Sequence, residues 1–158
     1  MFRIIHIILL TTFISLSAVA QEPLPAIVER DSVLTKEGSP YYIQQNLSIN
    51  SGITLKITAG SQVILSSGVT LINNGNLIIE GNEEEYVLFT SDAPGNRWNY
   101  IENRGSFFAS FLLIRRGVRF VTSYGDSLII LNCDVADTYG DVGDDCIGAH
   151  NAVIVAYI

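Results

Sequence analysis

The chain has 158 residues, of which 48% are hydrophobic and 16% charged, and this composition excludes intrinsic disorder for most of its length. Sixteen acidic against nine basic residues give a net charge of -7, which argues against a nucleic-acid partner because such a chain repels phosphate polymers. The length predicts one domain.

The first twenty residues have the pattern of a secretory signal. Arg3 precedes a short apolar run, and the small residues Ala18-Val19-Ala20 form a cleavage site. We predict a signal peptide over 1–20, and therefore a secreted, periplasmic or cell-surface protein. The alternative is a membrane anchor, for which the apolar run is short, since a spanning helix needs about twenty apolar residues. Export would place Cys133 and Cys146 where a disulfide can persist, and the sequence leaves their pairing open.

Residues 21–40 are predicted to form a polar leader, because Pro23, Pro25 and Pro40 interrupt any regular element there. From Tyr41 onward, apolar and polar residues alternate with period two, which predicts β-strands. The alternating apolar positions are Leu47 and Ile49; Ile53, Leu55 and Ile57; Val63 and Leu65; Val69 and Leu71; Leu77 and Ile79; and Val87 and Phe89. Turn glycines separate these runs at nearly even steps, at Gly52, Gly60, Gly68, Gly75 and Gly81.

Even spacing of short strands fits either antiparallel hairpins or a coil in which each strand pairs with the strand one circuit later. We favour the coil, because strands of three to five residues make poor hairpins and most corners lack the Asn-Gly or Asp-Gly pairs of short hairpins. A three-strand circuit would run from Gly52 to Gly75 or from Gly60 to Gly81, a length typical of solenoid repeats.

A pair of similar segments near the C-terminal end predicts one more circuit. Asp126-Ser-Leu-Ile-Ile-Leu resembles Asn151-Ala-Val-Ile-Val-Ala at a spacing of 25 residues. In the predicted coil this spacing stacks Leu128 on Val153 and Ile130 on Val155, so that inward side chains form aliphatic ladders.

These segments together resemble a known family. The matching stretches are Ser39-Pro-Tyr-Tyr-Ile, Leu47-Ser-Ile, Gly52-Ile-Thr-Leu-Lys-Ile-Thr-Ala-Gly-Ser-Gln-Val, Gly75-Asn-Leu-Ile-Ile-Glu-Gly and Val87-Leu-Phe-Thr-Ser, followed by Trp98. They are similar to the opening circuits of secreted proteins of the pectate-lyase-like superfamily. The resemblance implies an all-β fold, a right-handed single-stranded parallel β-helix over 41–158. Its members include lyases, hydrolases and adhesins, so the fold leaves the function open.

The predicted β-helix reaches Ile158 in the middle of an apolar strand. Solenoids need polar caps at their ends to stay soluble. We therefore expect further C-terminal circuits, or another chain, to cover this end.

The segment from Asn132 to His150 gathers five aspartates with a histidine. Within it, Gly143-Asp-Asp-Cys is similar to a signature of polygalacturonases, β-helical enzymes that hydrolyse pectin with paired carboxylates. That resemblance implies catalytic roles for Asp144 and Asp145, and His150 is either a general base or a surface histidine. The other motifs of that family are not found, and adjacent strand residues point to opposite faces.

The same acidic segment supports two other interpretations. Calcium prefers several oxygen ligands, which Asp137, Asp141, Asp144 and Asp145 could supply, although their spacing matches no EF-hand loop. A solvated acidic loop is the commoner outcome for such a run and needs no ligand. We therefore expect no required cofactor, with calcium as the alternative.

Two further clusters are candidates for substrate binding. Arg115 and Arg116 could hold the carboxylates of an acidic polysaccharide through paired hydrogen bonds. Trp98 and Tyr100 could stack on sugar rings through their flat apolar faces. Each cluster has a structural alternative, namely a solvated strand face for the arginines and a packed core position for Trp98.

The sequence as a whole predicts an exported structural or glycan-binding module at the cell surface or outside the cell. Stacked circuits repeat similar side chains about 4.8 Å apart, a spacing that suits a polymer. The alternative is a lyase or hydrolase that acts on an acidic polysaccharide such as pectin. A third possibility is an assembly segment that grows by end-to-end stacking.

Overall fold

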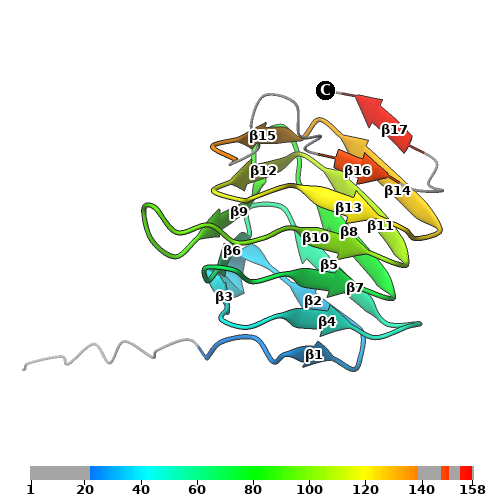
Figure 1. The fold of residues 1–158 in the computed structure, drawn as a ribbon, viewed down its shortest axis with the longest axis horizontal. Coiled ribbons are helices and arrows are strands. Elements are labelled where there is room, and N and C mark those ends of the chain that lie inside the picture. The colour runs from blue at the N-terminus through cyan, green and yellow to red at the C-terminus, as the bar shows by residue number, and fades with distance from the viewer. Residues whose placement is uncertain (1–21, 139–146, 150–153, 158) are drawn as a thin grey trace, which may run out of the picture.

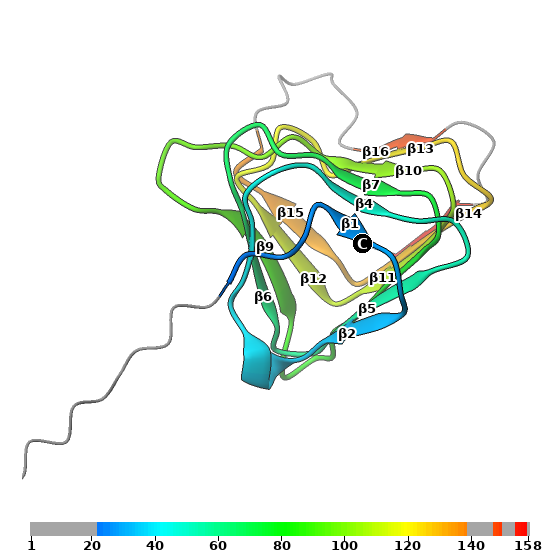
Figure 2. The ribbon, with the colours of Figure 1, turned by 90° about the horizontal axis from the view of Figure 1, so that it is seen from below.

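The protein is an all-β parallel solenoid in the computed structural model, which describes residues 22–138, 147–149 and 154–157. The chain winds through about five turns, and each complete turn contributes one strand to each of three sheets (Figure 1). Viewed from one end, the sheets form the three sides of the solenoid (Figure 2). The predicted all-β coil is confirmed.

The three sheets, named here A, B and C, are built from strands taken in rotation along the chain. Sheet A contains β1 (Ile27–Val28), β4 (Leu47–Ile49), β7 (Leu71–Asn73), β10 (Ile101–Asn103), β13 (Val121–Ser123) and β16 (Ile147–Ala149). Sheet B contains β2 (Ser32–Leu34), β5 (Thr54–Thr58), β8 (Asn76–Glu80), β11 (Ser106–Ser110), β14 (Ser127–Leu131) and β17 (Ile154–Tyr157). Sheet C contains β3 (Tyr41–Ile43), β6 (Gln62–Leu65), β9 (Val87–Ser91), β12 (Leu112–Arg115) and β15 (Asp134–Ala136).

Helical structure is nearly missing from this part of the chain. The single helical element among the described residues is a short 3-10 turn, η1 (Lys36–Gly38). Over the same residues, no helix has the length and apolar character needed to cross a membrane.

Each strand pairs in parallel with its counterpart one turn later. In sheet B, Leu55 of β5 lies opposite Leu77 of β8, and Leu77 lies opposite Phe107 of β11. Every pairing among the described strands is parallel, so antiparallel hairpins are excluded there. The strands predicted between Leu47 and Phe89 are confirmed.

Alternate side chains of the strands point into the solenoid and stack as ladders. In sheet B the ladder of Leu55, Leu77, Phe107 and Leu128 is at most 2% exposed at any position. Full burial of one such side chain stabilises the fold by about 1.5–3 kcal/mol. The core is therefore the main source of stability in this solenoid.

The solenoid begins earlier than the sequence predicted. Strands β1 and β2 lie within the predicted polar leader over 21–40 and pair with β4 and β5. Before them, the Leu24 amide donates to the carbonyl of Tyr42 (2.8 Å), and the Leu24 side chain packs against the core. The prediction was wrong because the prolines flank these short strands, where a proline costs no ladder hydrogen bond. The segment forms the first turn.

The register of the last described turn also differs from the prediction. Leu128 lies opposite Ile154, and Ile130 lies opposite Ala156. The predicted partners, Val153 and Val155, are each one residue too early, since Val155 lies opposite Ile129. A shift of one residue exchanges the two faces of a strand, so the predicted stacking was wrong although the extra circuit is present.

Three glycines stack at the corner between sheets A and B. Gly75, Gly105 and Gly125 follow β7, β10 and β13. A methyl group on Gly105 would lie 2.1 Å from the carbonyl oxygen of Gly75, and one on Gly125 would lie 2.1 Å from the carbonyl oxygen of Gly105. The backbones of successive turns touch here, and only glycine fits.

Beside these glycines, buried polar side chains form a ladder from turn to turn. The amide nitrogen of Asn73 donates to Oδ1 of Asn103 (2.7 Å), and that of Asn103 donates to Oγ of Ser123 (2.8 Å). The two amides also donate to the carbonyls of Ser106 and Ser127 in the next strands. All three ladder residues are 0% exposed. Since an unpaired buried polar group is costly, the ladder fixes the register between turns.

In the described part of the chain, four residues other than glycine adopt a left-handed backbone at the other corners. Phe111 and Asn132 follow sheet B strands with φ of 48° and 51°, whereas Arg116 and Asp137 follow sheet C strands with φ of 56° and 55°. The same corner geometry therefore recurs in successive turns. Asparagine tolerates this conformation better than most residues do.

The corner at Asn132 gives a test of this backbone geometry. We expect Asn132→Val to lower the free energy of unfolding by about 1–2 kcal/mol, because a β-branched residue is strained at positive φ. Asn132→Gly is the matched control and should leave stability unchanged or raise it slightly. Urea denaturation of the three proteins measures the difference, and equal stability of the valine and glycine variants would contradict the left-handed geometry.

Candidate functional site

A shallow hollow lies on the outer face of sheet B and is a candidate site in the described part of the chain. Its volume is about 210 Å³, and it is open to solvent. We call it the sheet B hollow. Its lining residues are Thr54, Asn76, Leu77, Ile78, Ser106, Phe107, Phe108, Ser127 and Ile129.

One side of the hollow is a row of small polar side chains. The row consists of Thr54, Asn76, Ser106 and Ser127, which are the first residues of four successive sheet B strands and lie opposite one another. The amide nitrogen of Asn76 donates to the hydroxyl of Thr54 (3.4 Å). All four side chains are partly exposed, so their hydroxyl and amide groups can reach a ligand.

A second row, two residues further along the strands, is apolar. On β8, β11 and β14 it consists of Ile78, Phe108 and Ile129, which lie opposite one another and are each half-buried, while on β5 the position opposite Ile78 is Lys56. Their neighbours Leu77 and Phe107 point into the core, as alternation in a strand requires. The hollow therefore presents an apolar strip, with one aromatic ring at its centre, beside a strip of hydrogen-bonding groups.

None of the nine side chains that line the sheet B hollow is ionisable. Lys56, two residues from Thr54 on β5, is paired with Glu80 (2.7 Å). At the corner before sheet B, Arg104 is paired with Glu102 (2.6 Å). The exposed carboxylate of Asp126 immediately precedes Ser127, and Oδ1 of Asp31 accepts the amide of Thr54 (2.8 Å). The charges that border the hollow are thus balanced pairs and additional acids.

The predicted arginine cluster lies at the corner after sheet C and is paired with aspartates. Arg115 contacts Asp134 (2.9 Å), while Arg97 (2.9 Å) and Arg116 (3.8 Å) contact Asp137. These pairs are partly exposed, and such pairs contribute little to stability. The arginines are partly neutralised by neighbouring carboxylates, as a solvated strand face would be.

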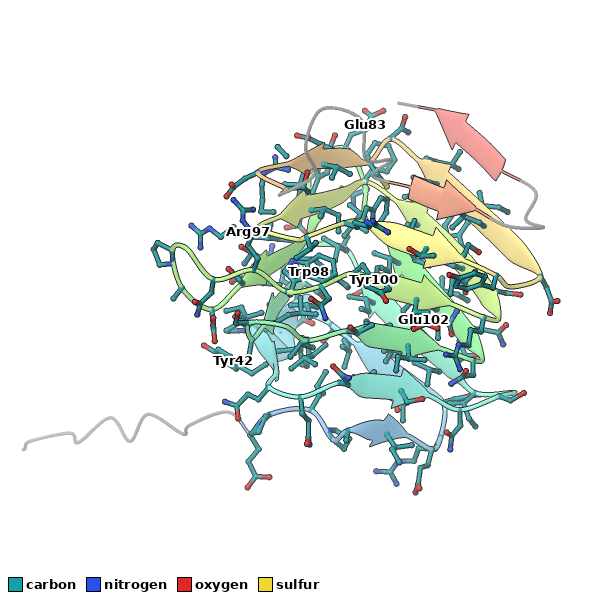
Figure 3. The ribbon with its side chains drawn as sticks, viewed as in Figure 1. Tyr42, Glu83, Arg97, Trp98, Tyr100 and Glu102 are labelled. Atoms are coloured by element: carbon teal, nitrogen blue, oxygen red, sulfur yellow. The ribbon has the colours of Figure 1, made fainter. Side chains whose placement is uncertain are left out.

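The predicted aromatic pair is divided between the core and the surface. Trp98 is 0% exposed, its indole nitrogen donates to the carbonyl of Arg115 (3.0 Å), and its ring packs edge-on against Phe89. The prediction that Trp98 stacks on sugar is therefore wrong, because its ring faces are covered by the core. Tyr100 remains partly exposed beside β10 (Figure 3).

The remaining predicted site residues are mostly outside the described part of the chain. Asp141, Asp144, Asp145 and His150 belong to this group, so their catalytic and calcium-binding roles stay predictions. Of the proposed calcium ligands, only Asp137 is described, and it pairs with two arginines. Across the described residues, no three His, Cys, Asp or Glu side chains gather as metal ligands.

Cys133 has the properties of a packed residue. Its side chain is half-buried against the core, and its sulfur contacts the carbonyl of Leu131 (3.4 Å). Burial raises the pKa of the Cys133 thiol above its ordinary value. A thiol that stays protonated at neutral pH is a poor nucleophile.

The sheet B hollow was missed in the sequence, although the sequence contains a signal for it. Three strands of sheet B have apolar residues at three consecutive positions, as β6, β9 and β12 of sheet C also do, and the central residue of each triplet must face outward. The sheet B triplets are Leu77-Ile78-Ile79, Phe107-Phe108-Ala109 and Leu128-Ile129-Ile130.

The fold and this surface define a class of protein, the parallel β-solenoids with three sheets. No family model matches the chain, and neither a curated protein nor a solved structure matches it. The function must therefore be argued from the surface itself.

Proposed function

We propose that this protein is an exported β-solenoid module that binds glycans through the outer face of sheet B. The observation that carries the proposal is the pairing of two parallel rows in the sheet B hollow. One row, Ile78, Phe108 and Ile129, is apolar, and the adjacent row is hydroxyl- and amide-bearing. The export is inferred from the signal-like residues 1–20.

This arrangement matches the chemistry of a sugar ring. A pyranose has apolar C–H faces that stack on an aromatic or aliphatic side chain, and it has hydroxyls around its rim that need hydrogen-bond partners. Phe108 and its two aliphatic neighbours offer the stacking surface. Ser106 and Ser127 lie beside it as donors and acceptors.

The hollow has features of a binding surface rather than a catalytic centre. Cleavage of a glycosidic bond by the usual route needs two carboxyl groups across the bond, and no carboxyl group lines the hollow. A shallow, open surface also leaves water in place, whereas catalysis gains from its exclusion. We therefore propose binding without turnover.

Phe108 should provide the largest contribution to binding, because it is the aromatic side chain on the outer face of the hollow. We expect Phe108→Ala to weaken retention by about tenfold in affinity electrophoresis on gels that contain plant or bacterial polysaccharides. The folded state should persist, because the side chain lies outside the core ladder.

Tyr42→Ala is the matched control for this experiment. Tyr42 is a partly exposed aromatic residue on β3, in sheet C rather than sheet B (Figure 3). Its loss should leave retention unchanged. Retention that survives Phe108→Ala, or that is lost in Tyr42→Ala, would place the glycan site elsewhere.

A further inference from the structure

We infer that the ligand of the sheet B hollow is an uncharged glycan whose chain lies along the solenoid axis, across the strands. This inference rests on the proposed function and specifies its ligand class and orientation. Two independent observations carry it, namely the order in which the lining residues are stacked and the distribution of charge around them.

The stacking order sets the orientation. The lining residues come from four neighbouring strands, β5, β8, β11 and β14, and like side chains follow one another from strand to strand. A chain that crosses β8, β11 and β14 meets the same pair of environments at each step, polar on one side and apolar on the other, whereas on β5 the residue beside the polar row is Lys56. A chain that lies along β11 would instead pass from Ser106 over Phe108 to Ser110, and so would meet one stacking residue.

The strand spacing sets the length of chain that the hollow accepts. Neighbouring strands lie about 4.8 Å apart, so the three intervals between β5 and β14 span about 14 Å. This distance holds about three sugar units, each of which covers roughly one strand interval. The affinity should therefore rise with chain length and then become constant.

The charge distribution selects uncharged ligands. Recognition of uronic acids or sulfated sugars requires arginine or lysine at the ligand, and no cation lines the hollow. The nearest lysine, Lys56, stands at the β5 end of the apolar row and is already paired with Glu80, and Asp31 and Asp126 border the polar row. With a net charge of -7 for the whole chain, an anionic polymer is repelled and a neutral one is not.

The test uses the full-length exported protein and measures dissociation constants by calorimetry. The neutral probes are oligosaccharides of two to six units from β-glucan, xylan and mannan, and the acidic probes are oligogalacturonates and alginate oligomers. We expect binding of at least one neutral series, with an affinity that stops rising at about three to four units. The affinity for the neutral oligosaccharide should change less than about twofold between low and high salt, since no ion pair with the ligand is formed.

Two serine variants test the orientation. Ser127 lies in the hollow one strand beyond Phe108, whereas Ser110 lies on the same strand as Phe108 but outside the lining. Ser127→Ala should weaken binding of the longest neutral oligomer about fivefold, the effect of one lost hydrogen bond, and Ser110→Ala should have no effect. The reverse result overturns the axial orientation.

The other outcomes separate this inference from the proposed function. Binding of an acidic series alone, weakened by salt, overturns the inference but leaves glycan binding intact. The absence of binding to every probe overturns both. Self-association that Phe108→Ala abolishes in sedimentation experiments would show instead that the face joins two copies of the chain.

Discussion

A Gly105→Ala variant is expected to lose at least about 4 kcal/mol of stability, the range reached by severe overpacking and clashes, and to be largely unfolded at 37 °C. The added methyl group would lie 2.1 Å from the carbonyl oxygen of Gly75 and 3.0 Å from the carbonyl carbons of Asn74 and Gly75. These atoms belong to backbone that is fixed by pairing on both sides, so they cannot move away. Urea denaturation followed by circular dichroism measures the loss.

Gly52→Ala is the matched control for this variant. Gly52 has a φ of 78° and nothing within 4 Å of the added methyl group, so its substitution introduces backbone strain without a clash. We expect a loss of about 1–2 kcal/mol there. If Gly105→Ala is no less stable than Gly52→Ala, the turns do not touch at this corner.

The second large effect is expected for Asn103→Ala. This substitution removes the acceptor of the Asn73 amide and the donor to Ser123 and to the Ser127 carbonyl, all in a fully buried ladder. Each buried group left unpaired costs about 1–3 kcal/mol, and we expect a total loss of about 3 kcal/mol or more. Thermal and urea unfolding measure this loss.

The control for the ladder is Asn50→Ala. Asn50 is an exposed asparagine next to the same corner, between β4 and β5. Its substitution should change stability by less than about 0.5 kcal/mol, as is usual for surface positions. A comparable loss in the two variants would show that the Asn103 side chain contributes no more than a solvated one.

The sequence alone predicted most of the architecture, because period-two alternation and regularly spaced glycines leave few arrangements for strands this short. The central strands from Leu47 to Phe89 lie where the alternation placed them. The first turn was missed because β1 has only two residues, too few to show a period. Its strands are recognisable only by their pairing with β4 and β5.

The candidate site was harder to predict than the fold. Motifs with charged residues predict a site at Arg115, Arg116 and the acidic segment. In the structure, these two arginines are paired with the carboxylates of Asp134 and Asp137. The sheet B hollow is made of ordinary residues, such as Ser106 and Phe108. They form a common surface only when four strands pair in the correct register. Register depends on the length of each corner, which residue patterns do not fix.

Unequal turns are what made that register hard to predict. From Leu71 to its partner Ile101 the chain uses 30 residues, and from Ile101 to Val121 it uses 20, while the strands on either side still pair residue for residue. The extra residues are accommodated at corners, including the segment between β9 and β10 that projects from the stack (Figure 1). The repeating unit is therefore one layer of three paired strands rather than a fixed number of residues. Relatives of such a protein are better sought by aligning these layers than by searching the sequence for a constant period.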